Sequence, residues 1–176
     1  MSLNPMNLDA ITRAMMVAEI DQDSSTGRAY LSPRLNERGS EEWVALLREA
    51  AERADDVWLA NEIRTRSLLN ETEQRRKPKG GYTQARVGVN APDMLAEGEF
   101  NRLYMRGLAR RAISEGKDTL VVYRAKEVAN PRPDSEAKIG TAVDPQKLLD
   151  DLRANIGNDT ALGLPAGPNS GLSVHL

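Results

Sequence analysis

The segment PDMLAEGEFNRLYMRGLARRAISE, residues 92–115, carries a long helical pattern and decides the fold. Its apolar and small residues recur at three- and four-residue spacing, as in an α-helix with one buried face. These residues are Phe100, Leu103, Tyr104, Gly107, Leu108 and Ala112. Pro92 suits the first turn of a helix, and Gly116 suits the left-handed residue that ends one. We therefore expect a core helix from Pro92 to about Glu115.

Strand patterns lie on both sides of this helix. Residues 82–90 alternate between two faces, and residues 119–124 contain the apolar run Leu-Val-Val-Tyr. A strand, a helix and a strand in this order predict a βαβ unit with a right-handed crossover, although an antiparallel pairing fits the same pattern. We expect the strand at 120–123 to pack over Gly107, because a glycine in a buried helix face allows another backbone to approach closely.

Four further helices are expected. Residues 8–20 form a short amphipathic pattern with Asn7 as the cap, and its apolar residues are Leu8, Ile11, Met15 and Ala18. Ser40 is placed to cap a second helix, and Asp55 or Asp56 to cap a third. Asp144 followed by Pro145 predicts a helix that runs to Ile156 and ends at Gly157.

These elements predict an α+β fold with three parts. Residues 37–156 form a small, mostly helical domain with a short two-stranded or βαβ element. Residues 1–36 form an N-terminal helical arm. Residues 157–176 are rich in glycine and proline and form an extended C-terminal arm, because such a segment buries too little apolar surface to fold alone.

The composition argues against most kinds of catalytic site. The chain contains no cysteine, which excludes disulfides, thiolate metal sites and a cysteine nucleophile. His175 is the only histidine and lies next to the last residue, and Ser170 has no nucleophile-elbow sequence around it. A Pro-Asp and Glu-x-Lys sequence at 133–138 lacks the separate strands that a metal-dependent nuclease site needs. We therefore expect no enzyme activity, no cofactor and no metal.

A row of arginines gives one alternative function. Arg102, Arg106 and Arg110 are four residues apart and share one face of the core helix, where Glu97, Glu99 and Glu115 can neutralise them. In a nucleic-acid-associated protein this arginine row would contact phosphates. A second basic region would assist, and it consists of Arg75, Arg76, Lys77 and Lys79.

The favoured interpretation is a non-enzymatic structural subunit of a homomeric or multi-protein assembly, such as a viral or phage-like particle. Its arms would lie on neighbouring subunits and bury apolar residues there. The expected assembly contacts are Leu162, Leu164, Leu172 and Val174. The partners would be copies of the chain or other subunits. We expect no membrane span and no signal peptide, and therefore a location in the cytoplasm or in an assembled particle.

Overall fold

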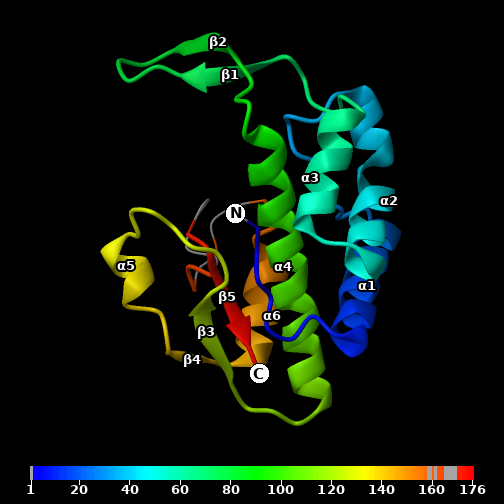
Figure 1. Ribbon diagram of the computed structural model, residues 1–176, viewed down its shortest axis with the longest axis vertical. Helices are drawn as coiled ribbons and strands as arrows, with labels where there is room; N and C mark the ends of the chain where they lie inside the picture. The colour runs from blue at the N-terminus through cyan, green and yellow to red at the C-terminus, as the bar shows by residue number, and fades with distance from the viewer. Residues whose placement is uncertain (1, 158–159, 161, 165–169) are drawn as a thin grey trace.

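The fold is α+β, as the sequence predicts. The computed structural model describes residues 2–157, 160, 162–164 and 170–176. These residues form helices and two small antiparallel sheets (Figure 1). The helices are α1 (Ala10–Ser25), α2 (Glu37–Arg53), α3 (Asp56–Thr65), α4 (Ala91–Ser114), α5 (Pro133–Glu136) and α6 (Pro145–Ala154). The strands are β1 (Thr72–Arg76), β2 (Tyr82–Arg86), β3 (Leu120–Arg124), β4 (Ala142–Val143) and β5 (Leu172–His175).

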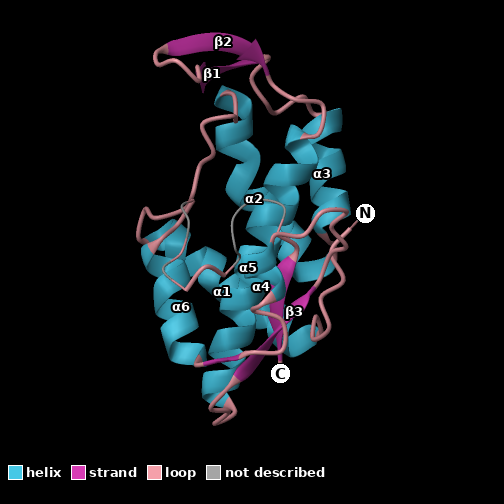
Figure 2. Cartoon of the chain, turned by 90° about the vertical axis from the view of Figure 1, so that its left-hand side faces the viewer, coloured by secondary structure: helices cyan, strands magenta, loops and turns pink. Residues whose placement is uncertain are grey.

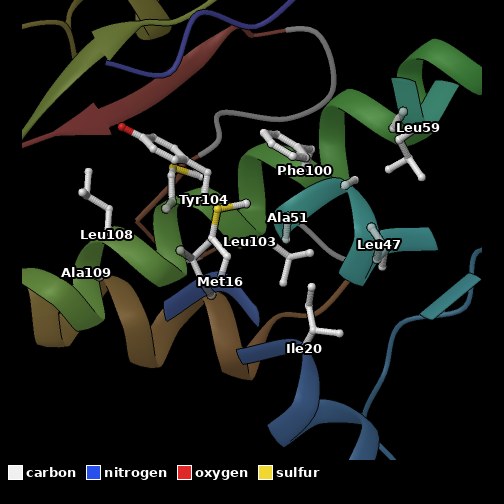
Figure 3. Close-up of a cluster of buried hydrophobic side chains, with 14 of the residues drawn as sticks. Met16, Ile20, Leu47, Ala51, Leu59, Phe100, Leu103, Tyr104, Leu108 and Ala109 are labelled. Carbon is white, nitrogen blue, oxygen red and sulfur yellow. The ribbon is translucent and has the colours of Figure 1, made fainter. Parts of the chain in front are cut away.

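The expected core helix is confirmed as α4, which forms the centre of the structure. Helices α1, α3 and α6 make their main packing contacts with α4. The side chains of Phe100, Tyr104 and Leu108 are almost fully buried. In Figure 3, Met16 of α1 lies next to Leu103 and Tyr104 of α4. A helix that is buried along much of its length can therefore organise the others around it.

Local capping explains where the other helices begin. Asp55 and Asp144 accept hydrogen bonds from backbone N–H groups of the first turns of α3 and α6, as predicted. The other two expected caps are wrong. Asp9 caps α1 in place of Asn7, and α2 is capped by Asn36, one turn before Ser40.

The βαβ interpretation is wrong, and the two expected strands do not pair with each other in an antiparallel arrangement either. Strand β2 pairs with β1 in a separate hairpin, whereas β3 lies between β4 and β5 in the other sheet. Both pairings of β3 are antiparallel. Because the strands before and after α4 belong to different sheets, α4 does not cross over between parallel neighbours.

The N-terminal segment is part of the same core as the rest of the chain. Met16 and Ile20 of α1 are buried against α2 and α4. The buried face is rotated from the expected one, since Ile11 is 52% exposed. Helix α1 therefore stabilises its own domain and does not extend away from it as an arm.

Residues 158–159, 161 and 165–169 of the expected C-terminal arm lie outside the described residues, and the described apolar residues of this segment pack within the chain. Leu164, Leu172 and Val174 are buried in the core, and Leu162 packs against the core from its edge. Strand β5 is paired with β3, and Asn101 of α4 donates a 2.8 Å hydrogen bond to the carbonyl of Leu172. These residues pack within their own chain here, and the prediction that they contact a neighbouring subunit stays a prediction.

The close neighbour of Gly107 is α1 and not the strand at 120–123. A Cβ atom added to Gly107 would lie 2.7 Å from Met16 Cγ, 2.9 Å from the Met16 backbone nitrogen and 3.1 Å from the Thr12 carbonyl oxygen. The sequence correctly indicated a close approach at Gly107. It did not identify the element, because the buried face of α1 was assigned to the wrong residues.

This contact predicts whether a small substitution at Gly107 stabilises or destabilises the fold. We expect Gly107→Ala to lower the free energy of unfolding by about 1–3 kcal/mol, because the backbone of α1 must move to admit the methyl group. The matched control is Gly98→Ala in the same helix, where an added Cβ meets no atom within 4 Å. The control should be neutral or stabilising by up to about 1 kcal/mol, since alanine favours a helix more than glycine does. Urea unfolding of both variants measures the difference, and equal effects would contradict the packing described.

Candidate functional site

Arg106, the central residue of the arginine row of α4, is buried in ion pairs within the domain. Arg106 is 1% exposed and pairs with Glu19 at 2.7 Å and with Asp23 at 2.6 Å, both from α1. Arg110 pairs with Glu19 at 3.2 Å. Arg153 of α6 also pairs with Glu19. This ion cluster joins α1, α4 and α6. Its buried guanidinium is not available to a phosphate.

The ends of the arginine row are also engaged. Arg102 is 7% exposed and donates a 2.7 Å hydrogen bond to the carbonyl of Asn155. Among the expected neutralising acids, Glu97 pairs with Lys126 and Glu115 pairs with Arg111. The sequence signal for the true partners was Glu19 and Asp23, two acids one turn apart that match the spacing of Arg106 and Arg110.

The ion cluster keeps Glu19 charged although its side chain is fully buried. Burial alone would raise the pKa of this carboxyl, but hydrogen bonds from Arg153 and the charge and hydrogen bonds of Arg106 outweigh it and lower the pKa. A lowered pKa means that the cluster stabilises the fold above the ordinary pKa of glutamate and loses this effect as the pH falls through the folded-state value.

The second basic region lies on the β1–β2 hairpin, which projects from one end of the molecule (Figure 2). We call residues 72–86 the ribbon. It contains five basic side chains and one acidic side chain, Glu73. Glu73 pairs with Arg34 and with Arg75. The remaining basic side chains of the ribbon are Arg76, Lys77, Lys79 and Arg86. They are exposed and have no hydrogen-bonding or ionic partner among the described residues.

The register of the ribbon places polar, cationic and aromatic groups on one face. Arg76 is opposite Tyr82, Gln74 is opposite Gln84, and Thr72 is opposite Arg86. Residues opposite each other, and residues two apart along a strand, lie on the same face. Tyr82 is 67% exposed, so this face carries an accessible ring beside Arg76.

A cavity of about 860 Å³ lies at the base of the ribbon, and we call it the groove. Thr72, Gln74 and Gln84 line it from the ribbon, and residues of the first half of α4 line it from the domain. Tyr30 contributes to the groove and to a second, smaller cavity. Its ring packs on Gly157, where an added Cβ would lie 2.3 Å from Tyr30 Cε2.

Glu99 of α4 lines both the groove and the smaller cavity. Its carboxyl has no hydrogen bond or ion pair with any described residue, and it is only partly exposed. Burial raises its pKa to about 7, although the charges of Arg102 and Arg106 oppose the shift; the charge of Asp23 adds to it. Sequence analysis assigned Glu99 only to charge neutralisation, because nothing in its spacing showed that it faces a cavity.

The remaining candidate residues do not form a catalytic constellation. His175 packs edge-on against Tyr123, with ring centroids 5.4 Å apart, and Ser170 is a buried loop residue whose hydroxyl accepts from the Leu172 N–H. Within the described ranges no three acidic or histidine side chains are arranged to hold a metal ion. A search of the same residues finds no helix that could span a membrane.

Comparison with known proteins adds no relative: no family model, curated protein or solved structure gives a significant match to the chain. The site must therefore be interpreted from its own geometry.

The ion cluster predicts a large effect of one substitution. We expect Glu19→Gln to lower the free energy of unfolding by about 3–5 kcal/mol at neutral pH, because it removes the buried carboxylate that Arg106, Arg110 and Arg153 share. Glu52→Gln is the control, since Glu52 and its partner Arg48 are largely exposed; it should change stability by less than about 1 kcal/mol. Chemical unfolding at pH 7 measures both. A mild effect of Glu19→Gln would show that the cluster is not needed for helix packing.

Replacing Glu99 should raise the stability of the fold, whereas replacing Glu19 should lower it, and the size of the Glu99 effect should depend on pH. The folded protein holds the Glu99 proton more tightly than the unfolded chain does, so stability falls as the pH rises from about 4.5 to 7. Glu99→Gln removes this loss. The variant should therefore gain about 1–3 kcal/mol relative to the parent protein between pH 5 and pH 8. Thermal or urea unfolding at both pH values tests this, and a constant difference would mean that Glu99 does not titrate in this range.

Proposed function

We propose that the protein is a non-enzymatic nucleic-acid-binding protein that contacts its ligand through the ribbon. The observation that supports this proposal is the set of exposed basic side chains on the ribbon without a partner among the described residues: Arg76, Lys77, Lys79 and Arg86. The proposal keeps the second basic region from the sequence analysis. It gives up the arginine row of α4, whose central member is buried in ion pairs.

The shape of the ribbon suits this role. A two-stranded β-ribbon fits the major groove of a duplex, and lysine and arginine side chains gain affinity by displacing counterions from phosphates. Single strands offer unstacked bases as well, and an exposed tyrosine beside an arginine can stack on them. Tyr82 and Arg76 are paired across the ribbon in this way.

The same charges make self-assembly through the ribbon a weaker explanation. Two copies that paired edge to edge would bring their basic side chains together, and charges of this kind are a common protection against strand pairing. The assembly interpretation also required apolar arms on a neighbour, whereas Leu164, Leu172 and Val174 are buried in the chain's own core. We therefore place nucleic-acid binding first and treat assembly as an outcome of the same experiment.

The test is a binding titration with labelled single-stranded and duplex oligonucleotides longer than about 16 nucleotides. We expect affinity to fall steeply between about 50 and 200 mM salt. The triple variant Arg76→Gln/Lys77→Gln/Lys79→Gln should weaken binding at least about tenfold and flatten the salt dependence. Tyr82→Ala should weaken single-strand binding more than duplex binding.

The matched control is Lys117→Gln/Arg132→Gln/Lys147→Gln, which removes the same charge from exposed side chains away from the ribbon. It should bind like the parent protein. Equal weakening by both triple variants would show that binding follows net charge and not the ribbon. Absence of binding at low salt, together with a solution mass that rises with protein concentration, would overturn the proposal in favour of assembly.

A further inference from the structure

We propose that the groove is a binding site for a small organic cation, an amine or a guanidinium compound, whose charged group pairs with the carboxylate of Glu99. This inference does not depend on the proposed function, because the ribbon and the groove use different side chains for recognition. It follows from the placement of Glu99 and from the partners of the other charged groups in the groove.

Most other charges that line the groove already have a partner within it. Glu97 pairs with Lys126, and Glu73 pairs with Arg34 at 2.6 Å. Arg102 donates to the backbone of Asn155. Glu99 differs, because its carboxyl has neither a hydrogen bond nor an ion pair with the described part of the chain. Glu99 is half-buried, so its carboxyl is partly desolvated, and a ligand that supplies a charged donor would give it a strong partner.

The required ligand group is a hydrogen-bond donor with a positive charge. A carboxylate accepts hydrogen bonds, and its strongest partners are ammonium and guanidinium groups. A divalent metal ion is a poor alternative, because it needs several oxygen ligands and, among the described residues that line the groove, Glu99 is the one carboxylate without an ion-pair partner. An anion would be repelled by the ionised carboxylate of Glu99.

The size and walls of the groove suit a compact organic ligand. Its volume of about 860 Å³ is in the range of small-molecule sites. Leu3, Met94 and Leu95 provide apolar surface, and Asn101 and Gln84 add polar side chains to the lining. An aliphatic chain with a cationic end would therefore contact both kinds of wall.

Titration of Glu99 gives the proposal a specific signature. Burial raises the pKa of this carboxyl to about 7. Glu99 must therefore lose its proton before it can pair with a cation. The charged groups around it are Arg102 and Arg106 on α4, Asp23 on α1, and the Glu97–Lys126 and Glu73–Arg34 pairs of the groove walls. Each of these groups is ion-paired or hydrogen-bonded, so Glu99 is expected to dominate the change in affinity from pH 6 to 8.

The experiment is a titration of the full chain with agmatine, which carries an ammonium and a guanidinium group, followed by NMR or calorimetry at pH 6 and pH 8. Affinity should rise about tenfold between these pH values as Glu99 becomes ionised. Glu99→Gln should abolish both the binding and its pH dependence. Glu52→Gln, on the exposed side of α2, is the matched control and should bind like the parent protein.

Two further probes decide the chemistry. An uncharged analogue with a urea group in place of the guanidinium should not bind, and a capped arginine tripeptide distinguishes a free small molecule from a protein side chain as the source of the cation. Equal binding of the uncharged analogue, unchanged binding by Glu99→Gln, or no binding of agmatine at millimolar concentration would each overturn the proposal. Loss of nucleic-acid binding alone would leave it intact.

Discussion

The close contact between α1 and α4 at Gly107 is the constraint on which the rest of the structure depends. Because Gly107 has no side chain, the backbone of α1 approaches to the distance of a direct contact. That approach brings Glu19 within hydrogen-bond reach of Arg106, and Arg153 then joins from α6. The three helices are therefore held by the apolar core around this contact and by one ion cluster. Since a buried carboxylate is costly without its partners, the contact and the cluster stabilise each other.

Much of the helical structure could be predicted from the sequence, because local signals define it. The buried face of α4, the cap at Asp55 and the Asp144–Pro145 start of α6 are all encoded within a few residues. Strand pairing was harder, since the partner of a strand depends on distant segments. Residues 82–86 and 120–124 were both expected to be strands, but only the three-dimensional arrangement shows that they belong to different sheets.

The site shows the same division between local and distant information. The basic residues of the ribbon were visible in the sequence, and their exposure follows from the lack of apolar residues around them. The role of Arg106 was not visible, because its partners Glu19 and Asp23 lie more than 80 residues away. Glu99 was hidden for the same reason. Its significance depends on a cavity whose walls come from the N-terminal segment, the ribbon and the C-terminal segment.

The exposure of the ribbon on both faces has a consequence for how the chain can diverge. Substitutions near Gly107 are restricted by packing, whatever the protein binds. Substitutions in the ribbon disturb little of the core, because its residues are mostly exposed and its two strands pair mainly with each other. The free energy of folding therefore places few limits on its side chains, and recognition alone can select them. A lineage could change the ligand preference of this element while the helical body remained almost unchanged.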